Sequence, residues 1–341
     1  MGEVILRQRD HAQAPDWLLI ETLGELDGNY NIVAWGIRPK EFLPIGKVVK
    51  GAAPRIRQVI SAVAASGQPL SLGDGGRSVE AYPHIVEGRL HSVQVWLGTA
   101  NQTPPPRPRA GAWYFDLTTM TSVSGAEWAV MAGISGENGR YRRSIADMFA
   151  QVHTDLGELA AIKKIITAVP GTVHQGIWTV KLADGSSFRS YFSCRIYEEL
   201  IDGQPHRLAR GVSQEIAAGP TGEPEPLILL EHRVMEAQIP ANEYHAVLNL
   251  QNLQLIRWVR GSSIPDRVAW RCRDGEPRPE VHPEDRRKMI DMAKGLARSS
   301  TSGRLRIRGV DGSWIPIIAQ AFLVAVDQET TAGLVKFTMD N

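Results

Sequence analysis

Hydrophobic and polar side chains alternate along two segments of the chain. In residues 187–197 one side carries Phe188, Phe192 and other apolar or small residues, and the other side carries arginines and tyrosines. Residues 304–308 alternate three arginines with apolar residues in the same way. A period of two with one polar side is typical of an antiparallel strand whose other side covers a core. Both segments are therefore predicted to be strands.

Asp-Gly pairs stand between such segments and predict hairpins. They occur at residues 184–185, 202–203 and 311–312. Both residue types tolerate positive φ, which tight hairpin turns require. In the N-terminal third, Glu87-Gly88-Arg89 is predicted to join a strand over 79–86 to another over 90–97.

Apolar residues at three-to-four spacing predict a few short helices. They cover residues 55–65, 156–169 and 283–297. Residues 227–238 are predicted to form a connecting helix.

Two proline- and glycine-rich segments divide the chain. The first, Thr103–Gly111, holds four prolines in five residues, which favours an extended conformation. The second begins at Gly219. The predicted organisation is a unit over 1–102, a linker over 103–111, a unit over 112–218, a linker and connecting helix over 219–239, and a unit over 240–341. The predicted fold class is α+β, with an antiparallel sheet flanked by short helices in each unit.

The second and third units share an order of features. Val152-His153-Thr154-Asp155 in one and Val281-His282-Pro283-Glu284-Asp285 in the other precede a predicted helix, and an Asp-Gly hairpin follows. The distance from His153 to Asp184 is 31 residues, and from His282 to Asp311 it is 29. This order resembles the PAS sensor domain, in which a strand opening W-x-x-D-L leads to a V-H-P-E-D helix start and a D-G-S hairpin. Residues 113–117 and the early helix at 128–133 are similar to the corresponding PAS segments.

The first unit is similar to either a PAS or a GAF domain, through its helix, Gly67-Gln68-Pro69-Leu70 and two closing strands. As a whole the chain resembles the small actinobacterial proteins with tandem PAS/GAF-type sensor domains and no output domain. The resemblance implies ligand sensing in the space between sheet and helices, and signalling to a protein partner.

Charge and composition narrow the classes of partner. Lys and Arg total 38 against 37 Asp and Glu, a net charge of +1. This balance argues against nucleic acid as a partner, because a nucleic-acid surface needs excess positive charge. No segment reaches the roughly 20 apolar residues of a membrane span. Two cysteines and the absence of an N-terminal signal segment predict a cytoplasmic protein with reduced thiols.

Sequence motifs of catalysis are missing. The chain lacks a phosphate-binding P-loop, a dinucleotide fingerprint, a Gly-x-Ser-x-Gly elbow and a His-Glu-x-x-His zinc pair. We therefore expect a protein that is not an enzyme, and the sequence indicates no cofactor and no metal site.

Aromatic residues of the second unit form the candidate ligand pocket. They could line a cavity between sheet and helices, or they could fill that space as core, and the core interpretation is favoured. The candidate residues are Trp113, Phe115, Trp128, Met131, Trp178, Phe188 and Phe192.

Other residues carry two interpretations each. His153 and His282 are typical either of haem or metal ligation or of helix starts, and their shared position in the repeat favours helix starts. Cys194, on the apolar side of a predicted strand, is interpreted as a buried structural thiol rather than a redox or chromophore site. The arginines of residues 304–308 could bind an anion or an acidic partner, although a solvated strand face is favoured.

The leading functional hypothesis is a cytosolic, non-enzymatic sensor or scaffold that senses a small ligand or a protein partner and signals through protein–protein interaction. The alternative is a haem- or flavin-binding sensor or a cryptic enzyme that uses the second unit's pocket. A third interpretation is that side chains fill all pockets, so that the protein is a purely structural interaction module. The sequence leaves the oligomeric state open, with a homodimer among the alternatives.

Overall fold

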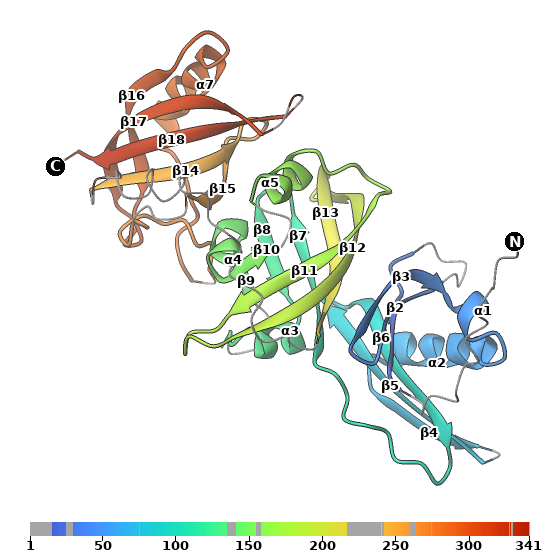
Figure 1. Ribbon diagram of the computed structural model, residues 1–341. Coiled ribbons are helices and arrows are strands. Elements are labelled where there is room, and N and C mark those ends of the chain that lie inside the picture. The colour runs from blue at the N-terminus through green and yellow to red at the C-terminus, as the bar shows by residue number, and fades with distance from the viewer. Residues whose placement is uncertain are drawn as a thin grey trace, which may run out of the picture. The chain divides into compact units, whose positions relative to one another are not determined.

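The computed structural model contains two compact units, residues 1–109 and 110–341, shown in Figure 1. The structure describes residues 16–24, 30–74, 76–134, 141–154, 158–216, 240, 242–259, 264–273, 275–326, 328 and 330–340. The predicted linker and connecting helix over 219–239 lie outside the described residues.

The first unit is built on a six-stranded sheet with the strand order β3-β2-β1-β6-β5-β4. Its strands are β1 (Leu18–Glu21), β2 (Asn31–Trp35), β3 (Arg38–Pro44), β4 (Leu70–Asp74), β5 (Arg77–Val86) and β6 (Arg89–Thr99). Its helices are α1 (Ile45–Val48) and α2 (Ala53–Ser66).

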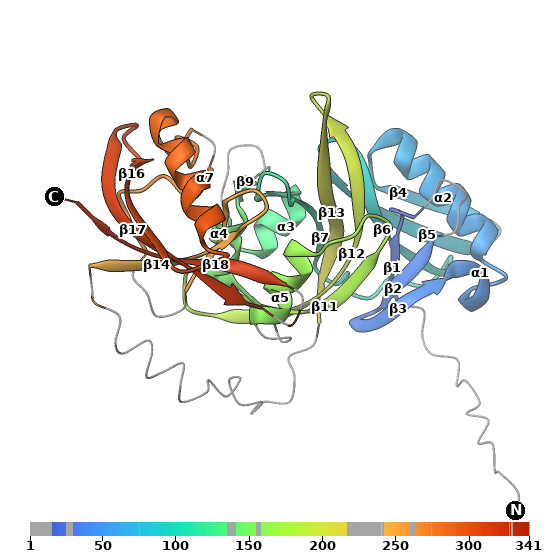
Figure 2. The ribbon, with the colours of Figure 1, turned by 90° about the horizontal axis from the view of Figure 1, so that it is seen from above.

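Helix α2 packs one apolar stripe on this sheet (Figure 2). Ile56, Ile60 and Val63 recur at helical spacing and are buried together with the inward side chains of the strands. Pro54 occupies the first turn, where its missing N–H costs nothing, and Gly67 ends the helix at a φ of +65°.

The proline-rich segment after β6 lies against the first unit's own residues. Trp17 donates its indole N–H to the carbonyl of Pro105 at 2.8 Å, and Gln94 donates to the carbonyl of Pro108 at 2.9 Å. The guanidinium of Arg107 stacks 4.3 Å from the ring centroid of Tyr82. These contacts hold an extended segment that has no sheet partners of its own.

The second unit contains a seven-stranded central sheet in the order β10-β11-β12-β13-β7-β8-β9. Its strands are β7 (Ala110–Asp116), β8 (Thr121–Ser124), β9 (Tyr141–Ser144), β10 (Val152–Thr154), β11 (Val173–Lys181), β12 (Ser187–Ile201) and β13 (Gln204–Glu215). Its helices are α3 (Ala126–Met131), α4 (Ile145–Gln151) and α5 (Glu158–Ile166).

The same unit contains a five-stranded C-terminal sheet in the order β15-β14-β18-β17-β16. Its strands are β14 (Glu243–Asn249), β15 (Gln254–Trp258), β16 (Thr301–Arg308), β17 (Trp314–Ala325) and β18 (Thr331–Met339). A short 3-10 turn, η1 (Pro283–Asp285), leads into α7 (Arg286–Gly295), which lies over one face of this sheet in Figure 2.

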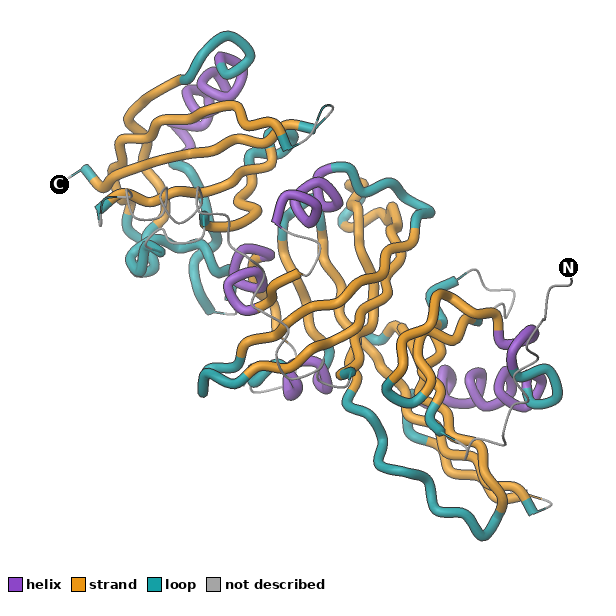
Figure 3. The backbone as a smooth tube through the Cα atoms, in the orientation of Figure 1, coloured by secondary structure: helices purple, strands orange, loops and turns teal. Residues whose placement is uncertain are grey.

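The predicted α+β class is wrong. Of the described residues, 50% lie in strands and 19% in helices, and Figure 3 shows how strongly strands prevail. The pairings within the three sheets are antiparallel, and several strands run for nine residues or more, as β12 does over Ser187–Ile201. The strand content exceeds the prediction because strands such as β1 and β8, of four residues each, are too short to show a clear alternation.

Several predicted elements are confirmed. The alternating segments form β12 and β16, and the Asp-Gly pairs turn β11 to β12, β12 to β13 and β16 to β17. In the second of these turns Asp202 and Gly203 both take positive φ, of 51° and 77°. The helices predicted over 55–65, 156–169 and 283–297 correspond to α2, α5 and η1 with α7.

Two local predictions differ from the structure. His153 lies in strand β10, where it pairs with Thr179, and not at a helix start. In β12, Tyr191 and Ser193 stand on the side predicted to be solvated, yet they are only 8% and 1% exposed.

Candidate functional site

The structure brings the seven predicted pocket residues together in the core of the central sheet. Trp113 and Phe115 come from β7, Trp178 from β11, Phe188 and Phe192 from β12, and Trp128 and Met131 from α3. All are buried except Phe188, which is half-buried against the same cluster.

The aromatic rings of this cluster contact one another. Ring centroids are 4.3 Å apart for Trp178 and Phe192, 4.4 Å for Trp113 and Phe115, and 5.1 Å for Trp113 and Trp178. The indole N–H of Trp113 donates to the hydroxyl of Ser213 at 2.8 Å, so its polar end is also satisfied. These contacts support the interpretation of a packed core, while a pocket at this position stays a prediction.

An apolar cavity of about 550 Å³ lies instead in the C-terminal sheet. Its walls are the inner face of the sheet, helix α7 and the segment between β15 and η1. Among the lining residues are Leu248, Trp258, Trp270, Met289, Leu305 and Phe337.

Strand β17 shows how the sequence makes room for this cavity. Ile315, Ile317, Ala319 and Ala321 are buried on the inner face, while the residues between them are exposed. Small side chains at Ala319 and Ala321 leave space that the methionines of α7 only partly cover. The sequence-based prediction does not include this site, although the strict alternation of residues 314–321 with two inward alanines is a readable signal.

Two indole N–H groups in the cavity wall lack hydrogen-bond acceptors. Trp258 and Trp270 are 8% and 3% exposed, and their rings meet edge to face with centroids 5.6 Å apart. Neither Nε1 atom finds an acceptor among the residues that the structure describes. Buried donors are normally paired, so both groups need an explanation.

Charged groups on the cavity wall pair with one another. Glu280 contacts Arg286 at 2.5 Å and Arg308 at 3.0 Å. The hydrogen bond from Arg308, together with that from Arg286, lowers the pKa of Glu280 below its ordinary value. Arg308 also stacks on Trp314, 3.6 Å from the ring centroid.

The predicted row of arginines on β16 makes intramolecular ion pairs. Arg304 pairs with Asp340, and Arg306 contacts Asp285 at 2.8 Å and Glu284 at 2.9 Å. With Arg308 bound to Glu280, all three guanidinium groups have partners within the chain. This pairing accounts for the row without an anion or a partner's acidic surface.

His282 caps the turn that starts at Pro283. Its Nδ1 accepts a hydrogen bond from the backbone N–H of Glu284 at 3.3 Å, which confirms the helix-start interpretation for this residue. The side chain of His153 lies outside the described residues. No group of three or more His, Cys, Asp or Glu side chains that could hold a metal ion occurs in the described part of the chain.

Cys194 is 4% exposed on β12, and burial raises the pKa of its thiol to about 12. This environment confirms the structural interpretation, because a thiol of this kind is protonated and inert at neutral pH.

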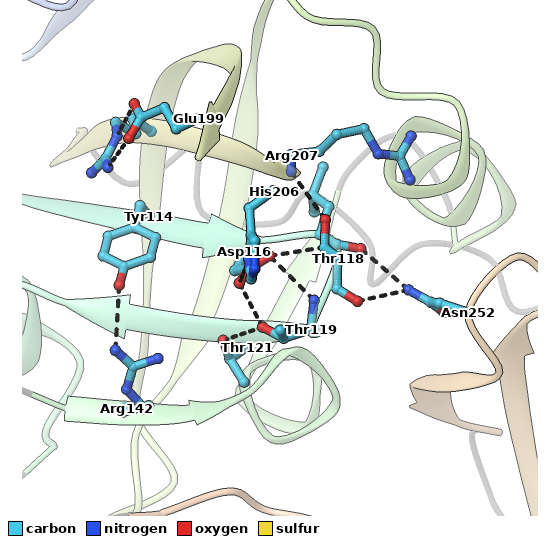
Figure 4. Close-up of polar contacts among 12 residues, drawn as sticks. Tyr114, Asp116, Thr118, Thr119, Thr121, Arg142, Glu199, His206, Arg207 and Asn252 are labelled. Atoms are coloured by element: carbon cyan, nitrogen blue, oxygen red, sulfur yellow. Dashed lines mark hydrogen bonds and ion pairs between the residues drawn. The ribbon is translucent and has the colours of Figure 1, made fainter. Parts of the chain in front are cut away.

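An Asp–His pair joins Asp116 at the end of β7 to His206 near the start of β13 (Figure 4). Nδ1 of His206 lies 2.7 Å from Oδ2 of Asp116, and the Thr119 hydroxyl donates to the same carboxylate at 2.7 Å. A nucleophilic hydroxyl would have to contact the imidazole, whereas Thr119 contacts the aspartate. The pair therefore links β13 to the end of β7, and Thr119 does not stand as a nucleophile beside the imidazole.

The β7–β8 turn meets the C-terminal sheet. The side-chain amide of Asn252, in the β14–β15 hairpin, donates to the carbonyl of Thr118 at 3.0 Å (Figure 4), and Arg207 donates to Oε1 of Gln251 at 3.3 Å. Asn252 is itself among the residues that line the cavity. One end of the cavity is thereby attached to the central sheet.

A second connection runs through Asp147 at the start of α4. Its carboxylate, 6% exposed, contacts Arg273 at 3.2 Å and Arg271 at 3.9 Å. The backbone N–H of Ser144 donates to the carbonyl of Arg271, and the Arg271 guanidinium lies 4.7 Å from the ring centroid of Trp270. The residue next to a cavity-lining tryptophan is thus bound to the central sheet.

Comparison with known proteins gives two family matches. The model described as "Rv3651-like, N-terminal" matches residues 16–106, and the model "Rv3651-like, C-terminal domain" matches residues 229–340. The chain carries the N- and C-terminal domains of the Rv3651-like family. The cavity, formed by residues between Ala246 and Phe337, lies wholly within the Rv3651-like C-terminal domain.

A solved structure shares the arrangement of the Rv3651-like chain. The crystal structure of an uncharacterised protein from Mycobacterium tuberculosis matches at 25% identity and a TM-score of 0.77, covering 96% of both chains. An RNA-binding Light-Oxygen-Voltage receptor matches at 11% identity over 68% of this chain and 95% of that one, with a TM-score of 0.24.

No curated protein matches the chain. None of the helices within the described residues is long and apolar enough to cross a membrane.

Proposed function

We propose that this Rv3651-like protein is a non-enzymatic sensor that binds a small molecule in the cavity of its C-terminal sheet. The observation that carries the proposal is the cavity itself: about 550 Å³, with walls that are mostly apolar side chains from the sheet and α7. Ligand sites in proteins are typically apolar concavities of about 300–1,000 Å³ with few polar groups.

The signal would leave the cavity through the two connections to the central sheet. Asn252 joins the cavity-lining hairpin to the β7–β8 turn, and the segment after Trp270 is bound to Asp147. A ligand that packs against Trp270 or the hairpin would bias the arrangement of these contacts, which is how a bound molecule shifts a two-state element. A protein partner would then bind the changed surface with a different affinity.

The PAS-like order of sequence features is a second source of support, because it belongs to a class of domains that sense ligands between sheet and helices. The proposed site differs in position from the pocket predicted from the aromatic residues. The central cluster of aromatics is closely packed, and the cavity lies in the sheet that follows it.

Native mass spectrometry of the freshly purified full chain tests the proposal. We expect a bound mass beyond that of the polypeptide. Ala319, 2% exposed on the cavity face of β17, is the position at which to fill the cavity, so Ala319→Phe should lose that mass. The matched control is Ile318→Phe on the same strand, because Ile318 is 49% exposed on the opposite face.

Loss of the mass in Ala319→Phe with retention in Ile318→Phe would support the cavity as the site. A polypeptide that carries no additional mass and binds no small molecule in solution would contradict the proposal. A haem or flavin absorption band that survives Ala319→Phe would favour the cofactor-binding alternative in the central sheet.

A further inference from the structure

We infer that the ligand of the cavity is an apolar carboxylic acid, bound with its apolar body between the sheet and α7 and with its carboxylate on Arg286. The inference rests on the proposed ligand-binding function and names the chemical class of the ligand. It is carried by the apolar interior, the excess positive charge where the cavity opens and the unused donors of Arg286.

The interior of the cavity favours an apolar body. Most of the side chains that line it are aliphatic or aromatic, such as Leu305 and Phe337 on the sheet and Met289 on α7. The indoles of Trp258 and Trp270 meet edge to face at 84°, which allows an N–H···π contact within the pair. The walls therefore favour apolar surface over polar groups in the body of the ligand.

Glu280, Arg286, Ile290 and Arg308 form the mouth of the cavity. All four line it, and the side chains of Glu280, Arg286 and Arg308 are 33%, 55% and 24% exposed. Ile290, one turn after Arg286 on α7, is 42% exposed. These residues border both the cavity and the solvent, so a charged group of the ligand at the mouth keeps contact with water and costs little to desolvate.

The mouth carries an excess of one positive charge. The carboxylate of Glu280 is shared by two guanidinium groups, with Arg286 bound to Oε1 and Arg308 bound to Oε2. Among the described residues, no other charged side chain lines the cavity. A second carboxylate, supplied by the ligand, would balance the second guanidinium.

Arg286 has the donors that a ligand carboxylate needs. A guanidinium group has five N–H donors, and within the described part of the chain that of Arg286 donates only to Glu280, through Nη2. Arg308 is engaged more fully, because it also donates to the carbonyl of Gly312 and stacks on Trp314. The remaining donors of Arg286, half-exposed at the mouth, can therefore hold a carboxylate whose apolar body lies in the cavity.

Two derivatives of fluorenone, a fused three-ring ketone, test the inference. One carries a carboxylate on an outer ring, and the other carries a carboxamide at the same position, so the two differ in charge and hardly in shape. We expect the wild-type full chain to bind the carboxylate about five-fold more tightly at about pH 7, as for a partly exposed ion pair. Isothermal titration calorimetry measures both affinities. In about 1 M salt the ratio should fall toward one, because salt screens the ion pair.

Variants of the mouth should change this ratio in opposite directions. Arg286→Met removes the excess charge, so the ratio should fall to about one. Glu280→Gln raises the excess charge, so the ratio should increase. The control is Arg287→Met, which removes the same charge from the next residue of α7, outside the lining of the cavity, and should keep the wild-type ratio.

The outcomes separate the two proposals. Equal affinity for both probes in the wild-type chain would overturn the inference and leave the cavity as a ligand site. A ratio lowered equally by Arg286→Met and Arg287→Met, or binding that Ala319→Phe leaves unchanged, would also overturn it, because the carboxylate would then not lie at the mouth. If neither probe binds, the inference fails, and an unaltered polypeptide mass in native mass spectrometry would then also overturn the proposed function. The wild-type ratio and its salt dependence need no variant, so they decide even if a variant fails to fold.

Discussion

At the scale of single residues, the close approach of α3 to strand β7 depends on Gly111. A Cβ atom at this position would lie 2.2 Å from the backbone nitrogen of Trp128 and 2.5 Å from its Cα. These are backbone atoms, so they cannot move aside as a flexible side chain could. The glycine thus lets Trp128 reach the aromatic cluster.

We expect Gly111→Ala to lower the free energy of unfolding of the second unit by about 3 kcal/mol, because overpacking forces the backbone apart. Gly51→Ala is the control, since a Cβ atom there would meet nothing within 4 Å. Its effect should stay within about 0.5 kcal/mol, as for most surface substitutions. Denaturant unfolding followed by tryptophan fluorescence measures both, and equal losses in the two variants would show that the close approach is not required.

The two thiols should react slowly in the folded chain. Burial raises the pKa of Cys194 to about 12 and that of Cys272 to about 11, from ordinary values of 9.0. The thiolate is the reactive form, so at about pH 8 its fraction falls roughly 1,000-fold for Cys194 and roughly 100-fold for Cys272. Ellman's reagent should modify both only after denaturation, with Cys272 the faster in the native chain. The reaction of Cys194 alone is measured in a Cys272→Ser variant. Its immediate modification in the native chain would contradict the burial of the Cys194 thiol.

Residue types in the sequence indicated the buried aromatics but not the unpaired indoles. Trp113, Trp178 and Phe192 could be named because they are aromatic residues of the second unit. The state of Trp258 and Trp270 depends on which acceptors the folded sheet places around them, and no local pattern carries that information. Unsatisfied donors are a tertiary property.

At the scale of secondary-structure elements, Arg306 connects β16 to η1. Its guanidinium and backbone N–H bind Asp285, and it also reaches Glu284. These hydrogen bonds lower the pKa of both carboxylates below their ordinary values of 3.8 and 4.5. The connection should therefore depend on pH.

A carboxylate whose pKa is lower in the folded state stabilises that state at pH values above its unfolded-state pKa. This contribution to stability is lost as the pH falls through the folded-state pKa. We expect the urea concentration at the unfolding midpoint of the second unit to decrease as the pH falls below about 4. In Arg306→Met this decrease should be smaller. Arg287→Met on exposed α7 serves as the control and should keep the wild-type profile. The measurement is urea unfolding across the acidic range, and parallel profiles for wild type and Arg306→Met would contradict the role of these carboxylates.

Elements with a regular pattern were predictable and those without one were not. The alternation of residues 187–197 predicted β12, but it could not show that Tyr191 and Ser193 would also be buried, because burial of the second face depends on the rest of the fold. The place of His153 in the repeat indicated a helix start, yet the pairing with β11 places it in a strand. Pairing across the sheet overrode the local signal.

At the scale of the whole molecule, the second unit joins a closely packed central sheet to a C-terminal sheet with a cavity. The aromatic cluster includes Ile256 and Ala332 from the C-terminal sheet, so the two sheets share buried contacts. Composition and motifs predicted a sensor-like protein with a ligand pocket. The aromatic residues placed the candidate pocket in what the structure shows to be the central sheet. The alternation of residues 314–321 indicates two small inward side chains on β17, but whether they leave empty space depends on how they face α7 across the fold.

The central claim is that binding of a ligand in the C-terminal sheet changes the stability of contacts in the central sheet. It is tested most directly by hydrogen–deuterium exchange of the full chain with and without fluorenone, an uncharged probe with a fused three-ring skeleton. We predict slower exchange in β14, β15 and α7, and also in α4 and the β7–β8 turn, which are bound through Asp147 and Asn252. In Asp147→Asn the change at α4 should be lost while that around the cavity persists. Exchange that changes only in the C-terminal sheet of the wild-type chain would contradict this coupling.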